Sequence, residues 1–247
     1  MPDENGGDDD ALAGLVDLDI SGLCDDFFDG GLGDMLVDDI LTGDETTFQT
    51  ELEPFAKIAR RARIEAKKKY FLWNRQENLR ELLTELPARD GGNFRVMGCN
   101  KFDAWSWVPV TVELMGGHCD ELYINTWIIN HFHVKELVEL IKTGKVGQAN
   151  VMTGLLFKKR EPSAYALLVE ELTKRGGRYL GILSHAKITL IGNHATGDYI
   201  VIETSANMST NAKVEQTAMT NDHELYDWYK GWFESVYTRH KEGAALW

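Results

Sequence analysis

Strand-like and helix-like segments alternate along the chain from residue 93 onward, and this alternation constrains the fold more than any other feature. Runs rich in β-branched and aromatic residues predict strands, and longer runs with apolar residues three or four apart predict helices. The expected strands are 93–98, 108–114, 121–129, 149–157, 178–183, 188–191, 199–203 and 216–220, and the expected helices are 133–143, 163–175 and 223–238. This order predicts a layered α/β domain.

For two of the expected helices the sequence also predicts a cap or a buried face. Ser163 follows Pro162 and is the expected N-cap of the helix 163–175. In the last helix, we expect one apolar face to pack on the rest of the domain. That face is formed by Leu225, Trp228, Trp232 and Val236.

One hairpin in this region gathers side chains that suit chemistry on a phosphodiester. The expected strands 188–191 and 199–203 flank a short turn, so the start of the first strand lies beside the end of the second. An imidazole, a cation, a hydroxyl and an amide then converge at one end of the sheet, with a carboxylate nearby in sequence. These side chains belong to His185, Lys187, Ser205, Asn207 and Glu215.

The pattern His185-x-Lys187 followed by Ser205-x-Asn207 resembles the signature of the phospholipase D superfamily. The resemblance covers roughly residues 93–240 and implies a phospholipase D-like layered sandwich, with a central mixed sheet flanked by helices. The stretch SANMSTNAKVEQ is also similar to that of bacterial and phage phospholipase D-like proteins. A second His-x-Lys, at His133 and Lys135, lies in an expected helix without a following Ser-x-Asn, and we interpret it as helix surface.

The resemblance implies a metal-independent phosphodiesterase that acts through a phosphohistidine and uses no cofactor. His185 would be the nucleophile, and Lys187 would neutralise the phosphate oxygens. Ser205 and Asn207 would hydrogen-bond the same phosphate. Glu215 would orient the imidazole, with Gln216 as an alternative for that role.

The chain departs from the family pattern in three ways. Gly192 stands where the family has an aspartate five residues after the lysine, and Asp198 is a possible substitute across the turn. Thr204 replaces the glycine before Ser-x-Asn. Finally, the chain holds one good signature, whereas the reaction needs a second histidine as general acid. A homodimer that shares one active site is therefore implied.

Charge divides the chain into unlike parts. Residues 1–53 hold 17 acidic residues and no Lys or Arg, whereas the remaining 194 residues hold 22 acidic and 26 basic ones. We expect an acidic, largely disordered tail over 1–53, a basic and amphipathic helical segment with a linker over 54–92, and the α/β domain over 93–247. The tail would bind the chain's own basic surface or a protein partner. The mildly basic body permits a nucleic-acid partner without demonstrating one.

Other protein classes fit the sequence less well. No apolar run approaches the roughly 20 residues of a membrane helix, and no secretory signal is visible, so a cytoplasmic protein is expected. Three widely spaced cysteines fit neither a disulfide framework nor a zinc site, and His118 and His131 lack a second ligand cluster. The leading hypothesis is a nuclease. The alternatives are a catalytically inactive relative that binds nucleic acid or a protein partner, and an α/β interaction module in which the pattern is coincidental.

Overall fold

The computed structural model describes residues 73–99, 102–209 and 214–242 of the 247-residue chain. Within these ranges seven strands form one sheet in the order β1-β7-β6-β5-β2-β3-β4. The strands are β1 Gly92–Cys99, β2 Cys119–Thr126, β3 Val146–Gly154, β4 Arg178–Ile182, β5 Ile188–Asn193, β6 Asp198–Thr204 and β7 Val214–Asn221. The β2–β3 and β3–β4 pairs are parallel and the other pairs are antiparallel. The predicted α/β class with a mixed sheet is confirmed.

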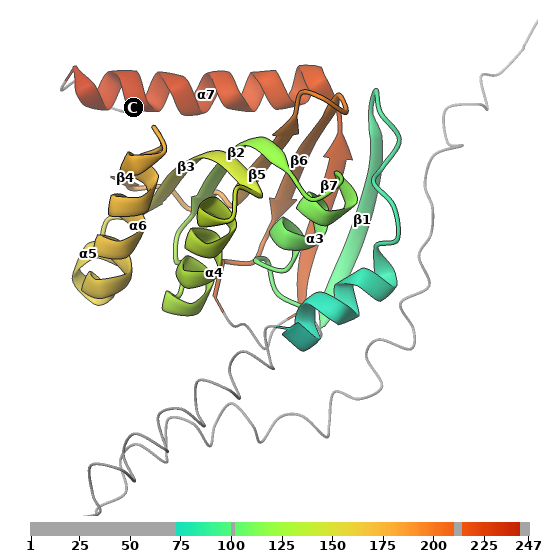
Figure 1. The fold of residues 1–247 in the computed structure, drawn as a ribbon, viewed down its shortest axis with the longest axis horizontal. Helices are drawn as coiled ribbons and strands as arrows, with labels where there is room; N and C mark the ends of the chain where they lie inside the picture. Colours follow the sequence, from blue (N-terminus) through green and yellow to red (C-terminus); the bar gives the residue numbers. More distant parts are fainter. Residues whose placement is uncertain (1–72, 100–101, 210–213, 243–247) are drawn as a thin grey trace, which may run out of the picture.

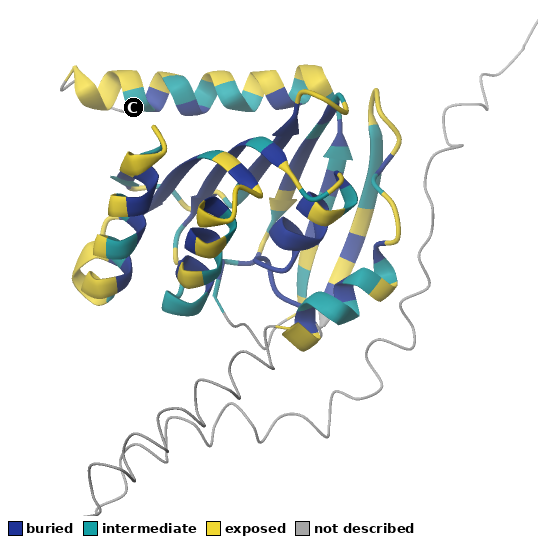
Figure 2. Ribbon diagram, viewed as in Figure 1, coloured by how far each residue is buried: buried dark blue, intermediate teal, exposed yellow. Residues whose placement is uncertain are grey.

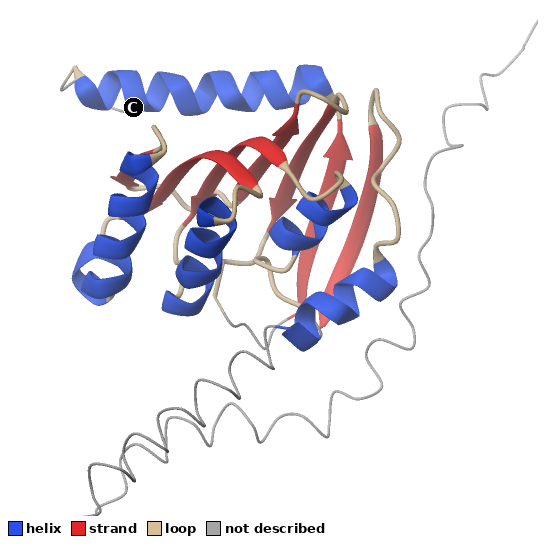
Figure 3. Cartoon of the chain, in the orientation of Figure 1, coloured by secondary structure: helices blue, strands red, loops and turns tan. Residues whose placement is uncertain are grey.

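Helices cover both faces of this sheet (Figures 1 and 3). They are α3 Trp107–Leu114, α4 His131–Lys142, α5 Phe157–Arg160, α6 Pro162–Lys174 and α7 His223–Lys241, together with a helix over residues 73–82. One face carries the helix 73–82, α3, α4 and α6, and α7 lies across the other. The predicted flanking of the sheet by helices is therefore confirmed as well.

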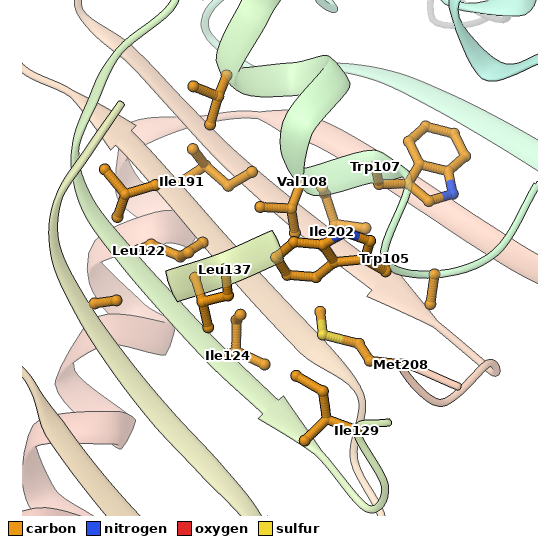
Figure 4. Packing of buried hydrophobic residues seen from close by; sticks show 14 of the residues in the cluster. Trp105, Trp107, Val108, Leu122, Ile124, Ile129, Leu137, Ile191, Ile202 and Met208 are labelled. Atoms are coloured by element: carbon orange, nitrogen blue, oxygen red, sulfur yellow. The ribbon is translucent and has the colours of Figure 1, made fainter. Parts of the chain in front are cut away.

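Alternation of side chains along the strands produces two hydrophobic cores. Leu122 and Ile124 of β2 point into the larger core under α3, α4 and α6, whereas Tyr123 between them points into the smaller core under α7. Figure 4 shows the larger core, where Trp105 lies fully buried among aliphatic side chains. Figure 2 shows that buried residues are concentrated on the strands and on the inner surfaces of the helices. Each central strand is thus buried on both faces.

The prediction of a strand over residues 108–114 is wrong, because these residues form helix α3. The alternating valines of this segment favour a strand by local propensity. In the structure every residue from Trp107 to Val112 is buried, so packing on all sides decides the conformation. Pro109 is tolerated because it lies in the first turn, where backbone N–H groups have no partner within the helix.

The ends and faces of two other helices also differ from expectation. The N-cap of α6 is Glu161 rather than Ser163, and it makes no side-chain capping bond. In α7 the buried residues are Tyr226, Phe233 and Val236, while the expected Trp228 is 65% exposed. Aromatic residues occur on several sides of α7, so the apolar periodicity did not identify the buried face uniquely. The predicted face lies about one residue away from the observed one.

The segment before the sheet packs onto it where the structure describes it. Leu79 and Leu83 lie buried in the larger core, and Arg89 pairs with Asp198 on β6 at 2.9 Å. The expected acidic tail 1–53 and the basic residues up to 72 lie outside the described residues, and the three-part division of the chain stays a prediction. Across the described ranges, no helix has the length and apolar character needed to cross a membrane.

Candidate active site

The side chains singled out by the sequence pattern lie at one edge of the sheet. The parallel strands β2, β3 and β4 end at this edge, β5 and β7 begin there, and β6 ends there. Backbone hydrogen bonds join the three segments that carry the pattern. The N–H of Thr204 donates to the carbonyl oxygen of Lys187 at 3.1 Å, and the N–H of Ser205 donates to that of Gln216 at 3.0 Å. The sheet itself therefore places the three segments side by side.

His185 and Lys187 are in direct contact. The Nζ atom of Lys187 lies 2.9 Å from Nδ1 of His185 and 3.4 Å from its Nε2. His185 is exposed, whereas Lys187 is half-buried. Burial lowers the pKa of Lys187, and the nearby carboxylate of Glu215 opposes that shift. The geometry thus groups an imidazole, an ammonium and a carboxylate at the start of β5 and β7.

Ser205 and Glu215 form a second contact pair beside the first. The Ser205 hydroxyl donates to Oε2 of Glu215, and the backbone N–H of Gln216 donates to the Ser205 oxygen at 3.0 Å. Because Glu215 acts electrostatically on Lys187, the two pairs form one charged cluster. The expected role of Glu215 as an orienter of the imidazole stays a prediction.

Asn207 lies in the loop after β6 at the same edge. Its carbonyl oxygen accepts a hydrogen bond from the N–H of Ser209 at 2.8 Å, which tightens the loop. The side-chain Oδ1 of Asn207 is buried and has no hydrogen-bond partner within the described part of the chain. A buried amide that lacks a partner costs free energy unless a ligand or water satisfies it. Asn207 therefore offers unused hydrogen-bonding capacity next to the cluster.

Asn125 on β2 holds the loop that carries His185, and the sequence pattern did not reveal it. This side chain is 1% exposed, and its Nδ2 donates to the hydroxyl of Ser184 at 2.9 Å and to the carbonyl of Ala186 at 3.1 Å. The two bonds bracket His185 in sequence. A polar residue within the apolar run ELYINTWII was the available signal, because a buried amide in a central strand needs specific partners.

Gly192 lies at the far end of β5, away from His185. A Cβ atom built on it would lie 2.7 Å from the hydroxyl oxygen of Tyr226 and 3.2 Å from Cγ of Glu121. The space for an aspartate side chain is thus filled by α7 and β2. Asp198 lies at that far end too, where it pairs with Arg89 and accepts a hydrogen bond from Asn221. The structure does not bring Asp198 to the cluster.

The interpretation of His133 as helix surface is wrong. This side chain is fully buried, its Nδ1 donates to the carbonyl of Met208 at 2.9 Å, and its Nε2 lies 3.2 Å from Oδ2 of Asp103. Asp103 also accepts from Arg75 and from the hydroxyl of Ser106. His133 faces inward because α4 packs this side on the core. It thereby holds the residue that follows Asn207.

No group of three or more His, Cys, Asp or Glu side chains suited to a metal ion occurs among the residues that the structure describes. His118 is partly exposed and bonds the carbonyl of Gly144 at 2.9 Å and the carboxylate of Asp120 at 3.3 Å. Those two contacts give His118 a structural role at the start of β2.

Comparison with known proteins gave no match to a protein-family model and no match to a curated protein. Solved structures with a similar chain trace include NucT from Helicobacter pylori, at 15% identity and a TM-score of 0.41, which covers 59% of this chain and 94% of that one. Polyphosphate kinase from Porphyromonas gingivalis has 17% identity and a TM-score of 0.43, over 62% of this chain and 26% of that one. TrmBL2, an archaeal chromatin protein with a novel mode of DNA binding, has 16% identity and a TM-score of 0.38, over 76% and 68% of the two chains. At this level of likeness, the chemistry rests on the side chains of the site.

Proposed function

We propose that this chain is a metal-independent phosphodiesterase of the phospholipase D superfamily that cleaves nucleic acid. The observation that carries the proposal is the cluster at the sheet edge, where His185 touches Lys187 and Ser205 touches Glu215. The arrangement supplies a nucleophile, a cation for the phosphate and hydrogen-bond donors within one small area. No single member of the cluster would support the proposal alone.

The contact between Lys187 and His185 fits a resting state without substrate. An ammonium group only donates hydrogen bonds, so the imidazole nitrogen must accept from it. A phosphodiester is an anion and accepts such a bond more strongly than a neutral ring nitrogen does. Substrate would therefore draw the Lys187 ammonium onto its phosphate and free the lone pair of His185 for attack.

The reaction then has two displacements at phosphorus. A ring nitrogen of His185 forms a bond to phosphorus while the bond to the leaving oxygen breaks, and a general acid protonates that oxygen. Water next attacks the phosphohistidine, loses a proton to the general base and returns the imidazole. The second histidine of this scheme would be His185 of another copy of the chain.

Exposed apolar side chains beside the cluster support a homodimer at this edge. Leu183, two residues before His185, is 65% exposed, and Leu155, which follows the neighbouring strand β3, is 57% exposed. Exposed leucines at the same end of the sheet as half of an active site are typical of a surface that another chain covers. A partner copy there would bring two His185 side chains to one phosphate.

A second candidate function is a catalytically inactive protein of the same fold that binds nucleic acid or a protein partner. It is favoured by Gly192, since Tyr226 fills the space that the missing aspartate would need. The binding surface could persist after loss of turnover.

Hydrolysis of bis(p-nitrophenyl) phosphate and of a plasmid in excess EDTA separates the two candidates. We expect cleavage that survives chelation and disappears in His185→Ala, with a covalent phosphorus adduct on His185 trapped by acid quench. The exposed His223→Ala variant is the control for loss of a surface histidine. Absence of turnover together with retained nucleic-acid binding would favour the inactive relative. A monomer under active conditions would overturn the shared site.

A further inference from the structure

A groove lies beside His185, between two segments that follow adjacent parallel strands. Residues 127–130 follow β2, and residues 155–161 follow β3 and include α5. The groove is a cavity of about 100 Å³. Its walls include Trp127, Ile128, Leu156, Arg160 and Glu161. It is therefore largely apolar with a cation and a carboxylate at one side.

Trp127 borders both this groove and the candidate nucleophile. Its ring centroid lies 6.2 Å from that of His185, with an angle of 45° between the planes. The indole also packs on Gly154, where an added Cβ would lie 2.7 Å from the carbonyl oxygen of Trp127 and 3.0 Å from its Cε3. Gly154 thus allows the ring to lie against the end of β3. The indole remains partly exposed, so a flat group in the groove could reach it.

Helix α5, at the rim of the groove, carries three exposed cations, Lys158, Lys159 and Arg160, and Arg160 lines the groove itself. Within the part of the chain that the structure describes, none of these three side chains forms an ion pair; Lys158 contacts the Tyr165 ring. Cations without partner carboxylates attract a polyanion at little desolvation cost. The rim therefore suits the phosphates of a nucleic-acid strand.

These features match a nucleobase better than a duplex or a lipid surface. An aromatic side chain stacks on a base only when the base offers its face, which a paired base inside a duplex does not. The groove is recessed, and Arg160 with Glu161 offers both donors and an acceptor to a base edge. Ile128 and Leu156 add apolar walls on which a ring can pack.

We propose that the Trp127 groove binds an unpaired base next to the phosphate at His185, so that single-stranded nucleic acid is the substrate. Lys158, Lys159 and Arg160 hold phosphates further along the strand. The assignment rests on the proposed phosphodiesterase function for the position of the scissile phosphate. It adds a substrate class and a recognition residue to that function.

Binding measurements on the full chain test the groove separately from catalysis. The His185→Gln variant in EDTA keeps a 5′-fluorescein-labelled 12-residue oligothymidylate intact during fluorescence anisotropy. The comparison probes are the same strand annealed to its complement and an abasic strand of equal length. We expect the single strand to bind more tightly than both, because stacking on one aromatic ring is worth about 5- to 150-fold in affinity.

Substitutions at Trp127 carry the decisive comparison. Trp127→Ala and Trp127→Leu in the same background should lose about tenfold or more for oligothymidylate and little for the abasic strand, while Trp127→Phe keeps most of the affinity. Trp127→Leu preserves apolar packing on Gly154, so equal losses in Leu and Ala variants with unchanged thermal unfolding exclude simple misfolding. Trp228→Ala removes an exposed tryptophan on α7 and should bind as the parent does.

Three results would overturn the groove as a base subsite. They are equal affinity for the single, duplex and abasic strands, unchanged binding in Trp127→Ala, and binding to phosphatidylserine–phosphatidylcholine vesicles with none to oligothymidylate. If a small phosphodiester is still cleaved with dependence on His185, the proposed function stands and the groove fails. If binding depends on Trp127 but no phosphodiester is cleaved, the groove stands and the proposed function fails.

Discussion

The ammonium nitrogen of Lys187 lies 2.9 Å from Nδ1 of His185, so the two residues of the His-x-Lys pattern are direct neighbours. Both residues precede β5, which begins at Ile188, so the contact joins two side chains of the segment between β4 and β5. Burial lowers the pKa of Lys187 while Glu215 counteracts the shift. The cation is thus held partly buried at the cost of some stability, which is typical of functional clusters.

Lys187→Met tests this cost. Because its pKa in the folded chain is below 10.5, the unfolded chain binds more protons between the lowered value and 10.5, and the free energy of unfolding rises with pH across that window. We expect the variant to be more stable than the native protein at pH 7, with the gap closing above pH 10.5, and to lose hydrolysis. Thermal unfolding at both pH values measures it. Lys145→Met is the exposed control, and an equal gap there would contradict the prediction.

Asn125→Ala should lower the kcat of hydrolysis strongly while lowering the free energy of unfolding only modestly. The variant removes two hydrogen bonds that bracket His185, each worth about 0.5–1.5 kcal/mol of net stability. Freed from them, the His185 loop would spend less time in the geometry for attack, so we expect kcat to fall at least tenfold with a smaller change in KM. Unfolding by urea and steady-state hydrolysis provide the two readouts.

Asn150→Ala is the matched control for that variant. Asn150 is equally buried but accepts its hydrogen bond from Arg178 at 2.9 Å rather than holding the His185 loop. We expect a similar loss of stability with kcat preserved. Equal losses of kcat in both variants would remove the positioning role of Asn125.

Gly192→Ala should destabilise the fold by about 1–3 kcal/mol, because the added Cβ meets the Tyr226 hydroxyl at 2.7 Å. The loss should shrink in a Tyr226→Phe background, where that oxygen is absent. A double-mutant cycle by urea unfolding measures the coupling. We also expect Gly192→Asp to lower stability without raising hydrolysis. Additive effects in the cycle would show that another contact limits this position.

Asp103→Asn should destabilise the fold by about 3–5 kcal/mol, since it removes one partner of a buried charged cluster. Burial alone raises the pKa of Asp103, but His133 and Arg75 outweigh burial and hold that pKa well below its ordinary value of 3.8. The unfolded chain therefore binds more protons in this acid range, and the free energy of unfolding falls as the pH drops below about 3.8. Urea unfolding between pH 3 and 7 should show a shallower acid dependence in Asp103→Asn than in the exposed Asp227→Asn.

Much of the strand and helix order followed from the sequence because most segments have a strong local pattern. In helix α4 the apolar residues recur with helical spacing, and the segment of strand β2 is rich in β-branched and aromatic residues. Helix α3 was not predictable in this way. Its valines favour a strand locally, and only the packing of Trp107 and Val108 inside the core makes it helical.

The candidate site was predictable as far as chemistry and chain order allowed. His185 and Lys187 were identified because the His-x-Lys pattern is a local property of the chain, and Ser205 followed from the hairpin. Asn125 lies 60 residues away from His185 in sequence, so the local pattern of β2 could not reveal its contacts with Ser184 and Ala186. Trp127 was missed for the same reason.

The sequence by itself determined the α/β class and the hairpin that brings His185, Lys187 and Ser205 to one edge, because these depend on patterns within short segments. Only the tertiary structure decided that His133 is buried against Asp103, that Tyr226 excludes a side chain at Gly192, and that Trp127 stands beside His185. These contacts join segments far apart in sequence. Their geometry is fixed by how helices and strands pack in three dimensions, which local periodicity does not encode.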